Sequence, residues 1–392
     1  MNNENVKFGI DQITFVAQLN DKEKLEKDDW DIIAERIINS IADKLCLKLI
    51  FGKKEPIEKT LEGYTKGYTY GINPFYFCIA YHEAHWEMGV CVKFSAQSLA
   101  CYISRYSEYF HKVILVPDII RTLSETASSY SIRISRIDIY ADIFNGTTTV
   151  NELCNDLSSN DYDIRFITGK KNPSKISYYT DAGVVNTIYI GSRKKNVTTL
   201  LRIYNKKKEQ IDSHGYRFDE AVTVDSWVRI EDEIKGQYAH DLTGTLVNIT
   251  SAEELIALIR TCILNKYQIV NVLTDEDHPI TKALKESGTS SDYYYSPNHY
   301  KDMSLSRSLD YLMKNSGLSS FVYRICSIKP DCMPLLMNYI EAYMRDNYKV
   351  SKDTAKWLQE NKDYYTPEDI EELLEPDSIS KEEAEDVDKE DR

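Results

Sequence analysis

A tyrosine flanked by basic residues is the first feature of the sequence with a chemical use. In LLRIYNKKKEQ, residues 200–210, Arg202 lies two residues before Tyr204 and Lys206 lies two residues after it. If this segment is a strand that continues to Lys206, the three side chains share one face. Their positive charges favour a phenolate and attract a phosphodiester, which a tyrosine that attacks DNA requires. The alternative is that Tyr204 is one of 29 tyrosines, packed on a sheet beside a solvated lysine run.

Two further segments carry acidic residues at strand spacing. Alternation in RIDIYADIF, residues 136–144, places Asp138 and Asp142 on one face, and WVRIEDEIK, residues 227–235, does the same for Glu231 and Glu233. Carboxylate oxygens are hard ligands of the kind that Mg²⁺ and Mn²⁺ prefer. The alternative is a solvated face with cross-strand salt bridges, in which Arg136 pairs with Asp138.

The net charge of −14 is unevenly distributed along the chain. Residues 366–392 contain 13 acidic and 3 basic residues, a balance of −10, whereas residues 166–217 contain 11 basic and 3 acidic residues, a balance of +8. Because charges farther apart than about 8–10 Å are largely screened, a polyanion responds to the local basic segment rather than to the total. The overall acidity therefore does not exclude a nucleic acid as the partner.

The periodicity of apolar residues predicts an α+β fold with a largely antiparallel sheet. Alternating runs predict strands at residues 7–17, 76–80, 87–94, 131–144, 186–191, 199–204 and 226–235. Helical spacing predicts helices at residues 30–45, 98–112 and 117–129. These elements must position the three segments on one sheet if the segments are to form a site.

A mostly helical region follows the predicted sheet. A capping box of Ser251 and Glu254 starts a helix, and helical spacing resumes at residues 305–314 and 333–345. The composition of residues 274–301 predicts a long loop between these helices. Thr366 precedes one last short helix, and the acidic residues after it predict a disordered tail.

The chain lacks several features that indicate other classes of protein. It has no run of about 18 apolar residues and no signal-peptide pattern at its start, so we expect a cytoplasmic protein without a membrane span. The eight cysteines include no CxxC pair, which favours reduced thiols and makes a zinc site unexpected. There is no GxxxxGK[ST] loop for ATP and no HxH pair for a histidine-held metal.

The order of five segments resembles the replication initiation factor family, which includes initiators of rolling-circle plasmids and relaxases of integrative conjugative elements. The segments are FGIDQITFVAQ (8–18), VKFSAQSLACY (92–102), RIDIYADIF (136–144), YIGSRKKN with LRIYNKKKE (189–196 and 201–209) and WVRIEDEIKG (227–236). The pair YIGSRKKN and LRIYNKKKE is the most specific of them. The resemblance extends over residues 8–240 and not beyond residue 250.

The resemblance implies a rolling-circle replication initiator that nicks and rejoins origin DNA through a 5′-phosphotyrosine intermediate. It implies Tyr204 as the nucleophile, with Arg202 and Lys206 beside the phosphate. It implies a divalent ion, Mg²⁺ or Mn²⁺, held first by Asp138 and Glu231 and second by Asp142 and Glu233. Contacts to flanking DNA fall to the basic residues of the same segments, namely Arg193, Lys194, Lys195, Lys207, Lys208 and Arg229.

The resemblance also implies a division of the chain and its partners. We expect a catalytic nicking and joining domain at residues 1–245, a helical region for origin or partner binding at 250–350 and the acidic tail at 351–392. A homodimer is expected, because ending a round of replication needs a second nucleophile. A host helicase is a further expected partner.

Three alternatives remain open from the sequence. Tyr189, on the strand before that of Tyr204, is a rival nucleophile, and Tyr204 is preferred because Arg202 and Lys206 flank it. A conjugative relaxase or a phage replication initiator would use the same chemistry at another DNA site. A non-catalytic DNA-binding regulator would use the basic segment and would need no metal-binding carboxylates.

Overall fold

The computed structural model describes residues 6–20, 27–71, 77–125, 130–192, 194, 197–287 and 317–351, with a few residues between 305 and 313 and between 354 and 374. The chain divides into two compact units, Met1–His299 and Tyr300–Arg392. The described residues of the first unit contain the large sheet. They also contain the candidate site residues, apart from Arg193 and Lys195, which lie outside the described residues.

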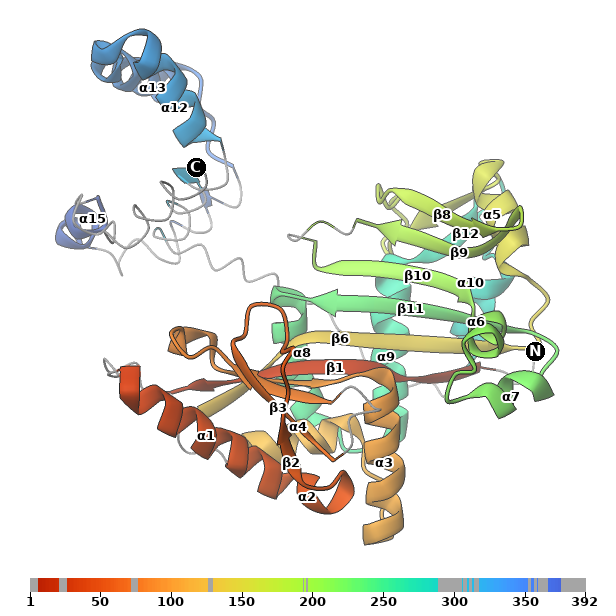
Figure 1. Cartoon of the computed structure of the whole chain (residues 1–392). Coiled ribbons are helices and arrows are strands. Elements are labelled where there is room, and N and C mark those ends of the chain that lie inside the picture. The colour runs from red at the N-terminus through yellow and green to blue at the C-terminus, as the bar shows by residue number, and fades with distance from the viewer. Residues whose placement is uncertain are drawn as a thin grey trace. The chain divides into compact units, whose positions relative to one another are not determined.

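A ten-stranded antiparallel sheet is the main element of the first unit (Figure 1). From one edge to the other, its strands are β2 (Lys54–Pro56), β3 (Lys66–Tyr70), β4 (Cys78–Tyr81), β5 (Val90–Phe94), β1 (Val6–Leu19), β6 (Tyr130–Phe144), β11 (Trp227–Lys235), β10 (Thr199–Asn205), β9 (Val184–Gly191) and β8 (Ile176–Asp181). A separate antiparallel pair consists of β7 (Tyr162–Arg165) and β12 (Gln268–Asn271). The expected α+β class with a largely antiparallel sheet is confirmed.

All of the strands expected from the sequence are present, and five others are not expected from it. The unexpected strands are β2, β3, β7, β8 and β12. β8 shows why, because after Ile176 every residue of the strand is exposed and no apolar alternation marks it. β2, β7 and β12 are three or four residues long, which is too short to show an alternation of apolar and polar residues.

Helices pack with one side of the sheet into a continuous hydrophobic core. They are α1 (Lys27–Lys44), α2 (Leu47–Ile50), α3 (Ala96–Phe110), α4 (Val116–Glu125), α5 (Val150–Ser158), α8 (Gln237–Asn248), α9 (Ala252–Lys266) and α10 (Pro279–Glu286). α8 and α9 contact β6, α5 contacts β9, and α1 and α3 contact β5. Figure 1 shows α8 and α9 behind β6 and β11, while α6 (Lys206–Ser213) and α7 (Phe218–Thr223) lie in front at one end of these strands.

The helices expected at residues 30–45, 98–112 and 117–129 are confirmed as α1, α3 and α4. The capping box is also confirmed, because Ser251 accepts from the backbone N–H of Glu254 and the Glu254 carboxylate accepts from that of Ser251. The expected loop at 274–301 is wrong in part, because residues 279–286 form α10, with Pro279 in its first turn. Residues 288–299 lie outside the described part of the chain.

The first unit extends to His299, beyond the domain boundary expected near residue 245. The reason is α9, whose Leu258, Ile259 and Ile263 are buried in the same core as Ile137 and Ile139 of β6. The first helices of the expected helical region therefore belong to the sheet-containing unit.

The second unit contains helices in its described residues. They are α12 (Leu318–Ile328), α13 (Met333–Asp346) and α15 (Pro367–Leu374), with a short 3₁₀ turn, η4 (Pro330–Cys332), before α13. The helices expected at 333–345 and after Thr366 are confirmed, whereas most of 305–314 and the acidic residues from 375 lie outside the described residues. Among the described helices of the chain, none is long and apolar enough to cross a membrane, and all eight cysteines are free thiols.

One carboxylate breaks the apolar pattern on the core side of β11. Asp232 is fully buried, and neither of its carboxylate oxygens has a hydrogen-bond partner among the described residues. Burial raises the pKa of Asp232 to about 7, and the positive charge of Lys266 opposes the rise. The Lys266 ammonium lies 3.9 Å from the ring centroid of Tyr238. Asp232 is therefore protonated in the folded chain over a pH range in which it is ionised in the unfolded chain.

We expect Asp232→Asn to remove a pH dependence from stability. A raised folded-state pKa contributes stability that is complete below the unfolded pKa of about 3.9 and is lost as the pH rises through the folded value. The wild-type free energy of unfolding should therefore lose up to about 4 kcal/mol through Asp232 between about pH 4 and pH 7. Urea denaturation across this range should show the difference between variant and wild type growing with pH. If the difference in the free energy of unfolding stayed constant with pH, as we expect for the exposed control Glu58→Gln, the raised pKa of Asp232 would be contradicted.

Candidate functional site

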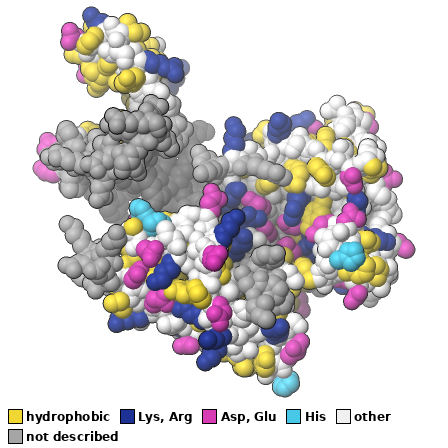
Figure 2. Space-filling view, in the orientation of Figure 1, with side chains coloured by type: hydrophobic (Ala, Val, Ile, Leu, Met, Phe, Trp, Pro, Cys, Tyr) yellow, Lys and Arg dark blue, Asp and Glu magenta, His cyan; other side chains and the backbone are white. Residues whose placement is uncertain are grey.

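The polar side of the sheet brings the segments singled out in the sequence onto adjacent strands. In β9, β10 and β11, Tyr189 lies opposite Arg202, and Arg202 lies opposite Glu231. Glu233, two residues further along β11, lies opposite Asp138 of β6. Figure 2 shows Lys or Arg side chains and Asp or Glu side chains interleaved over these strands. The cross-strand register therefore places the tyrosine and carboxylate candidates on one face.

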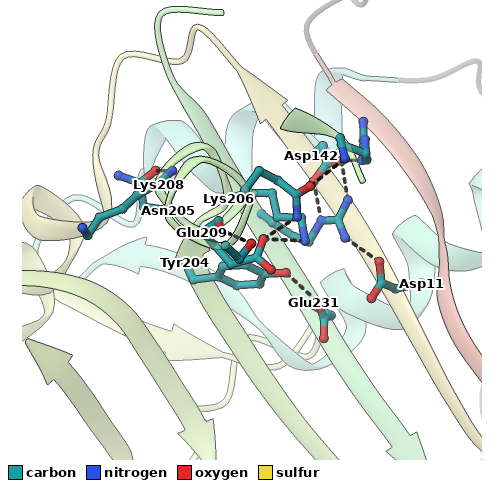
Figure 3. A network of polar contacts seen from close by, with 12 residues as sticks. Asp11, Asp142, Tyr204, Asn205, Lys206, Lys208, Glu209 and Glu231 are labelled. Atoms are coloured by element: carbon teal, nitrogen blue, oxygen red, sulfur yellow. Dashed lines mark hydrogen bonds and ion pairs between the residues drawn. The ribbon is translucent and has the colours of Figure 1, made fainter. Parts of the chain in front are cut away.

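Tyr204 lies at the centre of a polar network at the end of β10 (Figure 3). Its hydroxyl donates a hydrogen bond to Glu231 Oε2 at 2.9 Å, and Arg202 Nη2 pairs with Glu231 Oε1 at 2.5 Å. The Arg202 guanidinium carbon lies 4.5 Å from the centroid of the Tyr204 ring. Glu231 thus contacts both the hydroxyl and the guanidinium that the sequence places two residues apart.

The electrostatics of Tyr204 differ from the expectation that its surroundings favour a phenolate. Burial and the charge of Glu231 raise the pKa of Tyr204 well above its usual value, and Arg229 and Arg202 oppose this only in part. The residue is 6% exposed. Tyr204 is therefore a neutral phenol, and any reaction at its oxygen requires a base for the proton. Glu231 is at the distance that such a base needs.

The sequence suggested that the strand continues to Lys206, but β10 ends at Asn205. The side chain of Asn205 accepts a hydrogen bond from the backbone N–H of Lys208 at 2.9 Å and so caps α6, which makes Lys206 the first residue of that helix. The Lys206 ammonium still lies 5.6 Å from the centroid of the Tyr204 ring, but it pairs with Glu209 at 2.8 Å and is buried. Lys206 is thus close to Tyr204 without a free charge.

Asp138 and Glu233 share a guanidinium. Arg136 donates to Asp138 through two nitrogens, at 2.8 and 2.7 Å, and its Nη2 also lies 2.8 Å from Glu233 Oε2. Burial raises the pKa of Asp138 to about 6; the Arg136 hydrogen bond and charge lower it, and the charges of Glu231 and Glu233 add to the rise. The salt bridge between Arg136 and Asp138, offered from the sequence as an alternative to a metal site, is present.

Asp142 belongs to a different network, in which Asp142 and Arg229 are fully buried. It receives Arg229 Nε at 2.7 Å, Arg229 Nη2 at 2.8 Å and Arg217 Nη1 at 2.9 Å, and it is 0% exposed. Arg229 also donates to Asp11 at 2.6 Å, and its guanidinium carbon lies 3.8 Å from the centroid of the Tyr140 ring. Four residues along the same strand separate Asp142 from Asp138 by about 13 Å. The expected grouping of Asp142 with the other carboxylates is therefore wrong.

Arg229 was expected to contact DNA, but the structure places it in buried ion pairs, which argues against that role. The side chain is 0% exposed and all of its charge is directed to Asp142 and Asp11. A buried guanidinium with two carboxylate partners has no surface to offer to a phosphate. Arg229 lies beside Tyr204, which is its cross-strand partner, and its ion pairs suit a structural role.

The donor chemistry of the remaining carboxylates suits a hard divalent ion. Asp138, Glu231 and Glu233 offer carboxylate oxygens on neighbouring strands, and the charges of Glu231 and Glu233 add to the effect of burial in raising the pKa of Asp138. In their present arrangement, Arg136 and Arg202 supply the positive charge that a metal would bring. Within the described residues, no three side chains of His, Cys, Asp or Glu converge as a ligand group. The residues fit the ion by donor type, with arginines occupying its electrostatic role.

Two cavities open on this face, with Arg202 lining both. The first, about 310 Å³, is lined by Arg136, Tyr189, Leu200, Arg202, Glu231, Glu233 and Lys235. The second, about 280 Å³, is lined by Tyr179, Asp181, Asn186, Thr187, Arg202, Tyr204, Asn205, Lys208, Glu209 and Asp212. The two candidate tyrosines thus line different cavities: Tyr189 lines the one that contains Glu231 and Glu233, and Tyr204 lines the other.

The lysines expected to bind flanking DNA differ in their surroundings. Lys194 is exposed, whereas Arg193 and Lys195 lie outside the described residues. Lys207 donates to the backbone carbonyl of Val224 at 2.7 Å. Lys208 pairs with Asp181 at 3.2 Å and with Asp212 at 2.7 Å. Lys194 is accessible to DNA, and its contact with DNA stays a prediction.

The roles of Arg217 and Asp11, and the contact of Arg136 with Glu233, were not recognised in the sequence. Arg136 bridges two carboxylates and keeps 37% of its side chain exposed, and Arg217 and Asp11 complete the pairing of Asp142 and Arg229. Asp11 had a signal, because it interrupts the alternation of FGIDQITF at a point where the β1–β6 register shifts. Such bulges often occur beside functional sites. Arg217 had no signal, since it reaches Asp142 from 75 residues away.

Comparison with known proteins gives a family for this part of the chain. Residues 132–286 match the family model described as "Replication initiation factor", a range that includes Asp138, Tyr204 and Glu231. No protein with a curated description matches the chain. One similar solved structure is that of a rolling circle replication initiator protein from Geobacillus stearothermophilus, at 18% identity and a TM-score of 0.47, covering 70% of this chain and 91% of that chain. Residues 132–286 are thus similar to the replication initiation factor family.

Proposed function

We propose that the chain initiates rolling-circle replication by nicking one strand of an origin and rejoining it, with Tyr204 as the nucleophile. The observation that carries the proposal is the hydrogen bond from the Tyr204 hydroxyl to Glu231, inside the region that matches the family model. A neutral phenol needs a proton acceptor before its oxygen can attack, and Glu231 is such an acceptor at 2.9 Å.

In the proposed step, the Tyr204 oxygen forms a bond to the phosphorus of one phosphodiester while its proton passes to Glu231. The bond between phosphorus and the 3′ oxygen breaks, and that oxygen takes up a proton. The products are a 5′ phosphate esterified to Tyr204 and a free 3′ hydroxyl. The reverse reaction seals the strand without ATP, because the phosphotyrosine ester conserves the energy of the broken ester.

The partly exposed arginines of the site are suited to hold the attacked phosphate. Arg202 and Arg136 keep 39% and 37% of their side chains exposed, although each is paired with a carboxylate. A guanidinium binds a phosphate through two parallel hydrogen bonds. Arg202 lies between the two cavities and is the better placed of the two, because its guanidinium lies against the Tyr204 ring.

A divalent ion is part of the proposal, with Mg²⁺ or Mn²⁺ held by Asp138, Glu231 and Glu233. Bound there, the ion would polarise the phosphate and stabilise charge on the leaving oxygen. Burial raises the pKa of Asp138 and the charges of Glu231 and Glu233 add to the rise, and a cation bound at this place would offset both effects. The homodimer, the host helicase and origin or partner binding by the later helices are further parts of the proposal, which follow from the similarity to the family.

The test of the proposed function is a covalent-adduct assay. Wild-type protein is mixed with labelled single strands that tile the DNA around its gene, with Mn²⁺ or with EDTA, and the products are separated under denaturing conditions. A metal-dependent adduct on one strand supports the proposal and locates the nick site. Tight binding without an adduct on any strand would favour the non-catalytic regulator, and an adduct formed only at a transfer origin would favour the relaxase.

We expect Glu231→Gln to slow adduct formation by roughly 100- to 10,000-fold, because glutamine cannot accept the proton of Tyr204. DNA binding should remain within a few-fold of wild type. The rates are to be measured by single-turnover adduct assays at increasing Mn²⁺ concentrations. A Glu231→Gln rate restored by excess Mn²⁺ would show that Glu231 acts through the metal alone. Glu87→Gln, a change at an exposed residue outside the site, should react as wild type does.

A further inference from the structure

The cavity beside Tyr204 has a lining that suits a base better than a phosphate. Its charged groups are Arg202 and Lys208, of positive charge, and Asp181, Glu209 and Asp212, of negative charge. Lys208 is already shared by Asp181 and Asp212. The cavity therefore offers no excess positive charge to a phosphate. It offers carbonyl, amide and carboxylate groups that can pair with the edge of a base.

The cavity also contains an exposed aromatic ring in line with Tyr204. Tyr179 lies opposite Thr187, and Thr187 lies opposite Tyr204, so the three residues form a row across β8, β9 and β10. Two strand spacings separate Tyr179 from Tyr204 by about 10 Å. Tyr179 is 62% exposed and lies on the edge strand of the sheet, where one strand of DNA can reach it.

The neighbouring tyrosine of β8 is on the other side of the strand. Successive side chains of a strand point to opposite faces. The Tyr178 hydroxyl accepts a hydrogen bond at 3.3 Å from the Oγ of Ser158, which is the last residue of α5. Tyr178 does not line the cavity. It is 41% exposed and so provides a matched control for Tyr179.

We infer that this cavity holds one nucleobase of single-stranded DNA, with the ring of Tyr179 as its stacking surface. The position of that base, next to the attacked phosphate, rests on the proposed role of Tyr204. Aromatic side chains stack on the face of any base, and carboxylate oxygens accept hydrogen bonds from exocyclic amino groups. Since Asp181 and Asp212 supply such oxygens, cytosine suits the cavity better than thymine, which has no amino group.

The binding test requires neither nicking nor knowledge of the origin. Labelled oligo(dC) and oligo(dT) strands of about 12 nucleotides are titrated with each protein in EDTA, and fluorescence anisotropy gives the affinity. Tyr179→Ala should weaken oligo(dC) binding by roughly 5- to 100-fold, the effect of one lost stacking contact. Tyr179→Phe keeps the ring and should bind as wild type does, and so should Tyr178→Ala. Wild type should bind oligo(dC) more tightly than oligo(dT).

Equal affinities of Tyr179→Ala, Tyr178→Ala and wild type would overturn the inference. It would also be overturned if Tyr179→Ala kept its affinity but halved the mass of the protein in solution, because β8 would then be a contact between copies. The adduct assay and the binding assay together separate the two proposals. If wild type forms no adduct but Tyr179→Ala still loses oligo(dC) binding, the nicking chemistry fails and the base pocket stands. If wild type forms the adduct and Tyr179→Ala both binds and reacts as wild type does, the base pocket fails alone.

Discussion

Tyr204→Phe is expected to abolish the covalent DNA adduct while leaving the fold and DNA binding intact. Phenylalanine keeps the ring that contacts Arg202 and removes only the oxygen that would bond to phosphorus. Removing the nucleophile of a covalent enzyme lowers its rate by roughly four orders of magnitude or more. The adduct assay with the labelled strand that reacts with wild type measures this directly. Thermal denaturation checks that the variant is folded.

Tyr189→Phe is the decisive companion variant, because Tyr189 lines the cavity that contains Glu231 and Glu233. It lies opposite Arg202, whose guanidinium lies against the Tyr204 ring. We expect Tyr189→Phe to form the adduct at a rate within about tenfold of wild type, since its hydroxyl is not the one bonded to Glu231. If Tyr189→Phe lost the adduct and Tyr204→Phe kept it, the nucleophile would be Tyr189.

The strands that bear the site were predictable because each alternates over six residues or more. β6 shows this, since Ile137, Ile139 and Ile143 point to the core while Arg136 and Asp138 point to the polar side. Alternation fixes which side chains share a face of one strand, but not which strand lies beside which. The pairing of Glu233 with Asp138 therefore became visible only in the sheet.

Burial at the site could not be predicted from the sequence. A solvated strand face and a buried polar network have the same alternation, so Arg229 reads as a surface cation although it is fully buried. Its partners Asp142 and Asp11 lie 87 and 218 residues away along the chain. The raised pKa of Tyr204 has the same origin, because burial is its largest cause.

The buried network beneath the site leads to the largest expected effect on stability. Arg229→Met fills a similar volume but leaves Asp142, 0% exposed, and Asp11, with 12% of its side chain exposed, without their shared guanidinium. Removing one partner of a buried ion pair costs about 3–5 kcal/mol, because the remaining charge stays buried without compensation. Urea denaturation monitored by circular dichroism should show this loss in the free energy of unfolding.

Two further variants separate charge from packing in this network. Arg217→Met removes a single contact to Asp142 from a side chain that is 17% exposed, so it should cost less than Arg229→Met. Asp142→Asn added to Arg229→Met should recover part of the lost stability, because it removes the stranded charge. If Arg229→Met were as stable as wild type but lowered the salt dependence of DNA affinity by about one phosphate contact, Arg229 would be a DNA ligand after all. Its burial between Asp142 and Asp11 leads us to expect the opposite, a less stable protein that binds DNA with an unchanged salt dependence while it is folded.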